Sequence, residues 1–283
     1  EYWELEEAKL RRMPPEKELA GKVALITGAA GGIGSATANK FLKEGCCVIL
    51  TDIDSKALQQ TKKSFQNKFG TDVVKSIVMD VTKENDVKKA VDESVNKFGG
   101  IDILVANAGF ASAAPFDKTS SKLWDKNMAV LSKGCFLISR EVYSQMMRQN
   151  IGGSIIFISS KNSLSASKGA SAYSVAKSSL LHLSRSIALE GAEHKIRSNI
   201  INPDAVIQNS RIWSGDWKKQ RAAGNNIPIN KVEEFYKNRS LLKVSVLPED
   251  IAEGIYFFAS SKSKKSTGNI INIDGGNITS FTR

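Results

Sequence analysis

The stretch Thr27-Gly-Ala-Ala-Gly-Gly-Ile-Gly34 directly follows a short apolar run and opens a segment of helix length. Gly28 allows a tight turn, Gly32 lets the backbone approach a ligand closely, and Gly34 permits close packing of the helix on the strand. The N-terminus of that helix supplies amide donors and a positive dipole, which together suit a pyrophosphate. A strand, this loop, a helix and a second strand, in that order, therefore favour a dinucleotide site over a glycine-rich turn without a ligand.

Outward from this loop, short apolar runs alternate with helix-length patterns from Leu19 to Gly276. Most runs are continuous and β-branched, as expected for strands that are buried on both faces of a parallel sheet. They cover Val23–Thr27, Val48–Asp52, Ser76–Asp80, Ile103–Ala108, Ser154–Ser160, Arg197–Asn202 and Asn269–Asp274. The helix-length segments between them include Gly34–Glu44, Ser55–Lys68, Lys83–Phe98 and Ser120–Gln149. We therefore expect an α/β fold, a Rossmann-type doubly wound parallel sheet of seven strands with helices on both faces.

A carboxylate ends the second predicted strand. Asp52 lies eighteen residues after Gly34, where a carboxylate accepts hydrogen bonds from an adenosine ribose and repels a 2′-phosphate. No Arg or Lys occurs within Ala29–Gly31 or immediately after Asp52. The pattern favours NAD over NADP. The alternative role for Asp52 is helix capping, for which Asp54 is the better candidate.

A second group of reactive side chains lies in Ser171-Ala-Tyr-Ser-Val-Ala-Lys177. Tyr173 and Lys177 are four residues apart, so on a helix they share one face. A free tyrosine titrates near ~10, and a lysine ammonium beside the phenol lowers that pKa, so the pair can exchange a proton with an alcohol near neutral pH. Thirteen residues before Tyr173, Ser160 ends an apolar run and can hydrogen-bond the same substrate oxygen. Alone, the Tyr-Lys spacing also fits an ordinary helix surface; beside the glycine loop it predicts acid–base catalysis.

The composition of the 283 residues, with 41% hydrophobic and 24% charged side chains, is typical of a globular protein. The formal net charge is +11, but the lysines are scattered and no basic run is interleaved with aromatics, so we expect no nucleic-acid partner. Three cysteines form neither a disulfide framework nor a zinc-binding spacing, and we expect no metal. No apolar run is as long as a membrane span and no signal peptide is present, so we expect a cytoplasmic protein without membrane association.

Residues 1–18 carry the alternating charges of an exposed helix, which Pro14-Pro15 should end. Because the sequence begins at Glu1 rather than Met, we interpret residues 1–18 as an N-terminal extension or a linker from a preceding domain. Residues 19–283 would then form the NAD-binding domain. Several apolar side chains of the extension either dock on another surface or belong to a frayed end: Tyr2, Trp3, Leu5 and Leu10.

The stretch from Ala205 to Val246 breaks the alternation because it is long, polar and interrupted by glycine and proline. We expect these residues 205–246 to form a substrate lid. Four aromatic side chains could close it over a substrate: Trp213, Trp217, Phe235 and Tyr236.

In combination, these motifs resemble the short-chain dehydrogenase/reductase family over about residues 19–283. The resemblance is carried by TGxxxGIG from Thr27, Asn107-Ala-Gly109, Ser160, Tyr173 and Lys177. It implies an enzyme in which Tyr173 is the acid–base residue, Ser160 polarises the substrate, and Lys177 binds the nicotinamide ribose and lowers the pKa of Tyr173. It also implies that NAD contacts Gly28, Gly32, Ile33, Gly34, Asp52, Ile53, Asp80, Val81, Asn107, Ala108, Gly109, Tyr173, Lys177 and Pro203. Thr267-Gly268 and Asp274-Gly-Gly276 resemble the closing segment of the family's tetramers, which implies a homotetramer.

A narrower resemblance is to the dehydrogenase half of bifunctional rhamnulose-1-phosphate aldolase/lactaldehyde dehydrogenase proteins. It is carried by Tyr2-Trp3-Glu4-Leu5-Glu6, Lys9-Leu10, Asn202-Pro-Asp-Ala-Val206 and Ser210-Arg-Ile-Trp-Ser214. It implies oxidation of L-lactaldehyde to L-lactate with NAD in rhamnose catabolism, and an aldolase domain fused before residue 1. The alternative from another functional class is a scaffold or sensor module that binds NAD without turnover.

Three positions depart from the family pattern: Leu131, Asp204 and Gln208. Leu131 stands where the family has an Asn that helps to hold a water in a proton relay, and Leu cannot replace it. Asp204 replaces the Gly after Pro203, and Gln208 replaces a Thr that contacts the carboxamide, although Gln can still bond an amide. Asn127 lies one helical turn before Leu131 and could reach the relay through an extra water. Alternatively, Leu131 blocks the relay, or Asn127 only caps the helix or faces solvent.

Overall fold

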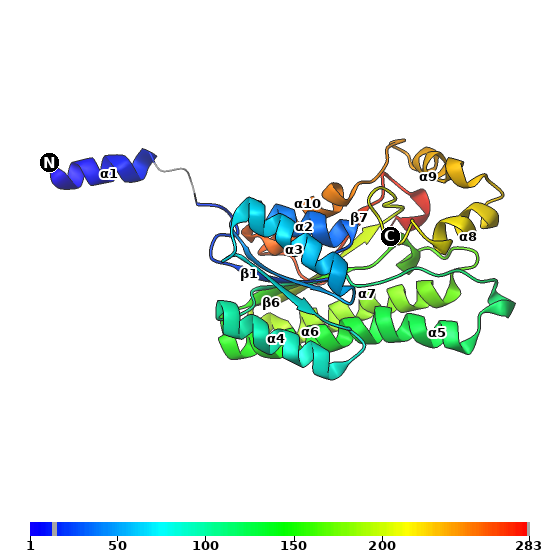
Figure 1. Cartoon of the computed structure of the whole chain (residues 1–283), viewed down its shortest axis with the longest axis horizontal. Coiled ribbons are helices and arrows are strands. Elements are labelled where there is room, and N and C mark those ends of the chain that lie inside the picture. The colour runs from blue at the N-terminus through cyan, green and yellow to red at the C-terminus, as the bar shows by residue number, and fades with distance from the viewer. Residues whose placement is uncertain (13–15, 282–283) are drawn as a thin grey trace.

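Figure 1 shows the computed structural model of the chain, which describes the backbone of residues 1–12 and 16–281 and the side chains of residues 1–9 and 16–281. This part forms one seven-stranded sheet in the order β3-β2-β1-β4-β5-β6-β7, with every neighbouring pair parallel. The strands are β1 (Val23–Thr27), β2 (Cys47–Asp52), β3 (Val74–Val78), β4 (Ile103–Ala106), β5 (Gly153–Ile158), β6 (Ile196–Pro203) and β7 (Ile270–Ile273). The predicted fold class and all seven predicted strands are confirmed, with strand ends displaced by at most two residues.

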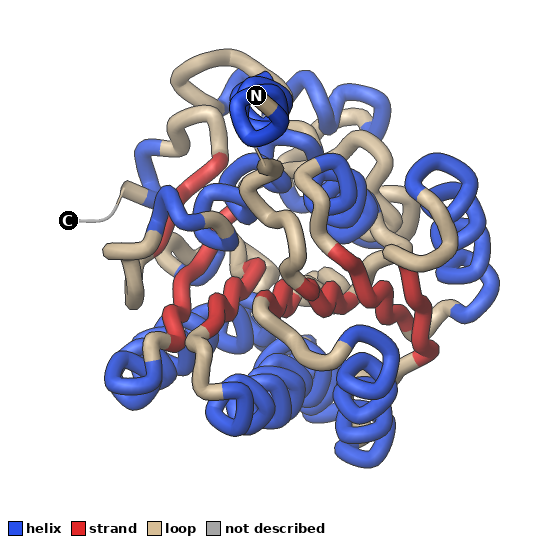
Figure 2. The backbone as a smooth tube through the Cα atoms, turned by 90° about the vertical axis from the view of Figure 1, so that its left-hand side faces the viewer, coloured by secondary structure: helices blue, strands red, loops and turns tan. Residues whose placement is uncertain are grey.

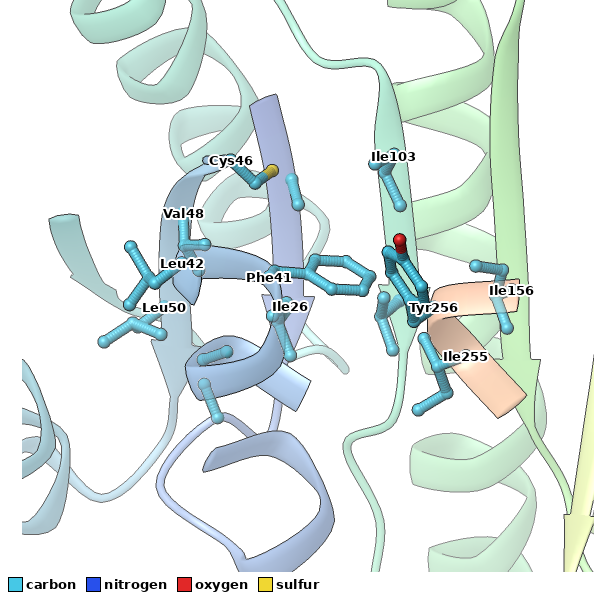
Figure 3. Packing of buried hydrophobic residues seen from close by; sticks show 14 of the residues in the cluster. Ile26, Phe41, Leu42, Cys46, Val48, Leu50, Ile103, Ile156, Ile255 and Tyr256 are labelled. Atoms are coloured by element: carbon cyan, nitrogen blue, oxygen red, sulfur yellow. The ribbon is translucent and has the colours of Figure 1, made fainter. Parts of the chain in front are cut away.

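Helices cover both faces of the sheet, as Figure 2 shows from the side. One face carries α2 (Gly32–Lys43), α3 (Ser55–Phe69) and α10 (Pro248–Ala259), and the other carries α4 (Glu84–Phe98), α6 (Gly134–Gln149) and α7 (Ser171–Gly191). Each face buries its own apolar cluster, because every residue of β1 and β4 is buried and alternate side chains point to opposite faces. On the first face, the ring of Phe41 from α2 points toward Tyr256 of α10 (Figure 3). The doubly wound arrangement therefore follows from strands that are apolar on both sides.

The segment predicted as one helix over Ser120–Gln149 has an irregular centre. It consists of α5 (Ser121–Asn127), a π-helical stretch η2 (Met128–Lys133) and α6. π-Helical turns within α-helices are frequent at functional sites. Leu131, the residue that departs from the family pattern, lies fully buried within η2.

The remaining α-helices of the described residues lie at the N-terminus and in the predicted lid. α1 (Tyr2–Arg12) confirms the predicted N-terminal helix, and its Tyr2, Trp3 and Leu5 side chains are exposed. Pro14-Pro15 and the side chain of Leu10 lie outside the described residues. The lid contains α8 (Asp216–Gly224) and α9 (Val232–Arg239), which share a small apolar cluster. No helix of the described residues combines the length and the apolar character needed to cross a membrane.

The strand order reverses beside β1, which pairs with β2 on one side and with β4 on the other. The loops that follow β1 and β4 leave the sheet in different directions at such a switch point, and a crevice opens between them. The glycine loop follows β1 and Asn107 follows β4, so the fold brings these two sequence motifs to one place.

Candidate functional site

A groove of about 610 Å³ lies at the carboxyl ends of β1 to β4. Ten of the predicted cofactor residues line it: Gly28, Gly32, Ile33, Asp52, Ile53, Asp80, Val81, Asn107, Ala108 and Gly109. Four others do not. Gly34 is packed behind the glycine loop, and Tyr173, Lys177 and Pro203 line a second, smaller cavity.

Close packing against β4 fixes the glycine loop. Asn107 Nδ2 donates to the carbonyl oxygens of Thr27 at 2.9 Å and Gly28 at 3.2 Å. Gly28 has a φ of +64°, and a Cβ there would lie 2.9 Å from the Cα of Ala108. A Cβ on Gly34 would lie 2.4 Å from the Gly28 carbonyl oxygen, so Gly34 serves close packing, as expected. Only glycine fits at these two positions.

The loop presents the N-terminus of α2 to the groove. The first N–H groups of a helix have no acceptor within the helix, and the N-cap residue Gly31 brings no side chain to occupy them. Gly31 and Gly32 both line the groove. These amides and the helix dipole suit a pyrophosphate.

Asp52 lies at the end of β2 and is only 9% exposed. Its carboxylate accepts hydrogen bonds from the backbone N–H groups of Ala30 (3.1 Å) and Asp54 (3.0 Å), which hold it at the wall of the groove. Asp54 accepts from the N–H of Ala57 at 3.0 Å and is the N-cap of α3. That hydrogen bond, helped by Arg211, holds the pKa of Asp54 below its usual value. Asp54 rather than Asp52 is therefore the capping residue, as the sequence predicted.

A basic residue that the sequence did not reveal completes this end of the groove. Arg211 of the lid forms an ion pair with Asp54, 157 residues away in the chain. Its Nη1 lies 3.9 Å from Oδ1 of Asp52. No Arg or Lys immediately follows Asp52 in the sequence, and only the fold of the lid brings Arg211 there.

The other predicted cofactor residue with a carboxylate uses it locally. Asp80 Oδ1 accepts from the N–H and the hydroxyl of Thr82, at 3.0 and 2.7 Å, in the turn after β3. Asp80 and Val81 nevertheless line the groove beside Asp52. They shape its wall on the β3 side.

The smaller cavity, of about 120 Å³, adjoins the groove and shares Ile33, Asn107 and Gly109 with it. It brings the three predicted catalytic residues together with side chains of the lid: Ser160, Lys161, Tyr173, Lys177, Trp213, Trp217, Arg221 and Tyr236. The ring of Trp217 lies 5.9 Å from that of Tyr173. Three of the four predicted lid aromatics line this cavity, whereas Phe235 packs within the lid.

The electrostatics of Tyr173 differ from the prediction. Burial raises its pKa to about 12, Asp204 adds to the rise, and the Ser160 side chain opposes it. Lys177 shares the helix face, but its Nζ donates to the carbonyl oxygen of Ile158 at 2.7 Å, and burial lowers the pKa of Lys177. The expected lowering of the Tyr173 pKa by Lys177 is therefore wrong for this arrangement, because the ammonium is directed at the end of β5.

The side chains around Leu131, which replaces the Asn of the family's proton relay, are buried. Leu131 packs beside the cavity, since a Cβ on Gly109 would lie 3.0 Å from its Cδ2. Asn127 is fully buried, and its Nδ2 donates to the Leu123 carbonyl at 2.8 Å and the Ser112 hydroxyl at 2.9 Å. Ser112 lines the groove, so Asn127 supports the groove wall and does not face solvent.

The other two departures are both held by lid residues. Asp204 accepts from Arg239 and, at 2.9 Å, from Asn277 Nδ2. Gln208 donates from Nε2 to Glu233 at 2.8 Å and does not line the groove. Gln208 is therefore bound to α9 in this structure, and its bond to a cofactor amide stays a prediction.

Two buried cations in the smaller cavity were not predicted. Lys161 (6% exposed) directly follows Ser160, and its Nζ donates to the Ser167 hydroxyl at 2.9 Å. Arg221 (8% exposed) lies on α8 and donates from Nε to the Tyr236 hydroxyl at 2.9 Å. The position of Lys161 beside Ser160 was visible in the sequence, but nothing local marked Arg221. Across the described residues, His, Cys, Asp and Glu side chains form no group of three that could hold a metal ion.

Comparisons with known proteins show which family the chain resembles. The family model described as enoyl-(acyl carrier protein) reductase matches residues 28–277. An uncharacterised oxidoreductase of Bacillus subtilis, YuxG, is 50% identical over 283 residues, which is all of this chain but 41% of that relative's length. The 3-oxoacyl-[acyl-carrier-protein] reductase FabG of Thermotoga maritima is 34% identical over 258 residues, 91% of this chain and 98% of the relative.

Solved structures share the fold over nearly the whole chain. A short-chain type dehydrogenase/reductase from Mycobacterium marinum has a TM-score of 0.82 and 28% identity, covering 93% of this chain and 98% of its own. A 3-ketoacyl-(acyl-carrier-protein) reductase from Brucella melitensis, complexed with NADH, has a TM-score of 0.79 and 26% identity, covering 92% and 99%.

Proposed function

Because the chain belongs to the short-chain dehydrogenase/reductase family of oxidoreductases, we propose that it transfers hydride between NAD and a small hydroxy or aldehyde compound. The observation that carries the proposal is the junction of the two cavities. Ser160, Tyr173 and Lys177 lie in the small cavity where it meets a groove of dinucleotide size.

We propose that NAD lies in the groove. Gly32 and the N-terminus of α2 would hold the pyrophosphate, Asp52 the adenosine ribose, and Asp80 and Val81 the adenine. Asn107 to Gly109 would line the path to the nicotinamide, whose ribose Lys177 would bind next to Pro203. The buried Asp52 carboxylate supports NAD over NADP, and a structural relative was obtained with NADH.

The residues of the small cavity supply the proton chemistry. In oxidation, the Tyr173 phenolate accepts the proton of the substrate hydroxyl while Ser160 hydrogen-bonds the same oxygen. A bound nicotinamide would supply the hydride acceptor, and its positive charge would favour the Tyr173 phenolate. Tyr173 returns the proton in the reverse direction. An aldehyde would first be hydrated to a gem-diol, which the same side chains could oxidise to an acid.

The resemblance to lactaldehyde dehydrogenases makes L-lactaldehyde a candidate substrate, in a rhamnose-degrading route. The small cavity supports a compact substrate. We further propose that residues 205–246 act as its lid, since Trp213, Trp217 and Tyr236 line the cavity that holds Tyr173 and the ring of Trp217 lies 5.9 Å from that of Tyr173.

For the organisation of the protein, we propose that residues 19–283 form the catalytic domain, that residues 1–18 lead in from a preceding domain of aldolase type, and that the domain is a homotetramer. The exposed apolar side chains of α7, Val175 and Leu189, and the edge strand β7 support an assembly of copies. Light scattering of the chain measures the number of copies.

The test of the proposed reaction is NADH formation, followed at 340 nm, with a panel of small hydroxy and aldehyde compounds that includes L-lactaldehyde. Tyr173→Phe should lower the rate by about 10²- to 10⁴-fold, the usual contribution of a general acid–base group, while NADH still binds. Tyr143→Phe, on α6 and packed against the apolar cluster beneath that helix, is the control and should keep the rate. A near-normal rate in Tyr173→Phe refutes the mechanism, and NADH binding without turnover of any compound favours a scaffold or sensor instead.

A further inference from the structure

Besides Lys177, which donates to the Ile158 carbonyl, two buried cations of the described residues face the small cavity without a carboxylate partner. Buried Lys and Arg side chains are normally paired with an acid. Within the described residues, neither Lys161 nor Arg221 forms an ion pair, and the side chains of both donate hydrogen bonds to neutral oxygens. Lys161 donates to Ser167, and Arg221 donates to the Tyr236 hydroxyl and the Lys168 carbonyl.

The acids of the neighbourhood are engaged elsewhere. Asp204 forms an ion pair with Arg239 and accepts from Asn277. Asp274 accepts from the backbone N–H groups of Gly276 and Asn277 and from the Ser280 hydroxyl. The cavity wall therefore keeps an excess of positive charge.

Both cations are held in place. The guanidinium of Arg221 lies over the ring of Trp217, 5.4 Å from its centroid, and its Nη2 donates to no described residue. Ser167, which accepts from Lys161, itself donates to Asn162 at 2.8 Å. Burial lowers the pKa of Lys161, Arg239 and Arg221 add to this, and Asp204 and Asp274 oppose it. An anion in the cavity would relieve the repulsion between the two cations.

We propose that Lys161 and Arg221 bind an acidic group of the substrate, a carboxylate or a phosphate, so that the enzyme acts on a small hydroxy acid or a phosphorylated hydroxy compound. The inference rests on the proposed function and narrows its substrate class. Lys161 directly follows Ser160, so the acidic group lies within a few atoms of the reacting oxygen. The reaction then converts the anionic alcohol and NAD into the anionic carbonyl compound, NADH and a proton, which Tyr173 accepts.

Calorimetric titration with matched probes tests the anion site independently of turnover. The probes are 3-hydroxybutyrate against its neutral amide, and glycerol phosphate against glycerol, each added to the protein with and without NADH. A charge-assisted hydrogen bond is stronger than a neutral one, so we expect an acid to bind about 10- to 100-fold more tightly than its neutral partner. The pair in which the acid gains more affinity over its neutral partner shows whether the site prefers a carboxylate or a phosphate.

Variants assign the preference to the two cations. Lys161→Gln and Arg221→Gln should each remove most of it, whereas the charge-retaining Lys161→Arg and Arg221→Lys should keep most of it. Lys219→Gln, an exposed change on the same helix α8, is the matched control and should have no effect. Arg221 also supports Tyr236, so the Arg221→Gln protein could fold poorly. In that case the comparison of Lys161→Gln with Lys161→Arg decides the test.

The outcomes separate the two proposals. Equal affinity for charged and neutral probes, or an unchanged preference in Lys161→Gln, overturns the anion site. Tight binding of an acid without NADH formation from any compound supports the anion site and overturns the proposed oxidoreductase reaction. Turnover of neutral compounds such as L-lactaldehyde in preference to acids overturns the anion site and leaves the reaction standing.

Discussion

Asp52→Asn should shift the cofactor preference from NAD towards NADP. The carboxylate is almost buried at the groove wall, where a 2′-phosphate would meet it. The substitution removes the negative charge and keeps the shape. An amide cannot accept from both Ala30 and Asp54 as the two carboxylate oxygens do, so binding of both cofactors should weaken to a similar degree.

The size of the shift follows from the charges at this end of the groove. Two unit charges at about 4 Å repel by about 4 kcal/mol at an effective dielectric constant of about 20. Salt and partial exposure of the phosphate reduce this to about 2–3 kcal/mol. The Arg211 side chain is 48% exposed, so its attraction for the 2′-phosphate offsets less than about 1 kcal/mol of this repulsion. The ratio of NADP to NAD affinity should therefore rise by about 30- to 150-fold.

The assay is fluorescence titration with NADH and NADPH of the wild type, Asp52→Asn and the double variant Asp52→Asn/Arg211→Ala. The double variant should lose part of the gained NADPH affinity, because the Arg211 guanidinium that would lie beside the 2′-phosphate is then absent. Glu249→Gln, an exposed change in the first turn of α10, is the control for net charge. An unchanged ratio in Asp52→Asn would mean that Asp52 does not face the ribose, and the placement of the adenosine end would be wrong.

Two further predictions concern the acid–base site and the relay. With the pKa of Tyr173 raised to about 12, its phenolate fraction grows tenfold per pH unit below that value, so kcat/KM for oxidation should rise from about pH 7 to about pH 10 while reduction, which needs the neutral phenol, stays level. A level oxidation profile would contradict this. Asn127→Ala should slow turnover several-fold without changing NADH affinity, whereas Leu131→Asn should leave turnover equal or faster. If Asn127→Ala turns over normally but unfolds more easily, Asn127 acts only by holding Ser112 and Leu123.

The fold was predictable because its signals are local. Each strand is a continuous apolar run, and the glycine loop between β1 and α2 fixes where the first crossover begins. Burial on both faces favours a parallel sheet, and right-handed crossovers limit the strand orders that such a sheet can have. The π-helical stretch η2 could not be seen, since Met128–Lys133 reads as ordinary helix in sequence. What distinguishes it is one extra residue per turn, which side-chain periodicity over six residues cannot resolve.

In the candidate site, too, some residues could be predicted from the sequence and others could not. The groove residues were predictable because they follow strand ends directly, and strand ends in a parallel sheet meet at one edge. Arg211, Arg221 and Arg239 were not, because they come from the lid, whose path over the sheet depends on its own small cluster of apolar side chains. The ion-pair partners of Arg211 and Arg239, which are Asp54 and Asp204, lie far from them along the chain. Long-range ion pairs of this kind leave no spacing in the sequence.

Tyr173 and Lys177 show how far sequence spacing can predict a site. The spacing correctly predicted that both residues share a helix face, but the conclusion that Lys177 lowers the pKa of Tyr173 was wrong. Four residues along a helix fix where two Cβ atoms lie, but a lysine ammonium stands four further bonds away and takes the best acceptor within that radius. Here the acceptor is the Ile158 carbonyl at the end of β5, next to Ser159, whose hydroxyl in turn donates to the Lys177 carbonyl. These two bonds tie α7 to β5 and so hold Tyr173 opposite Ser160. In this structure Lys177 therefore acts on the site through position, and the charge that would favour the Tyr173 phenolate must come from elsewhere in the assembled site.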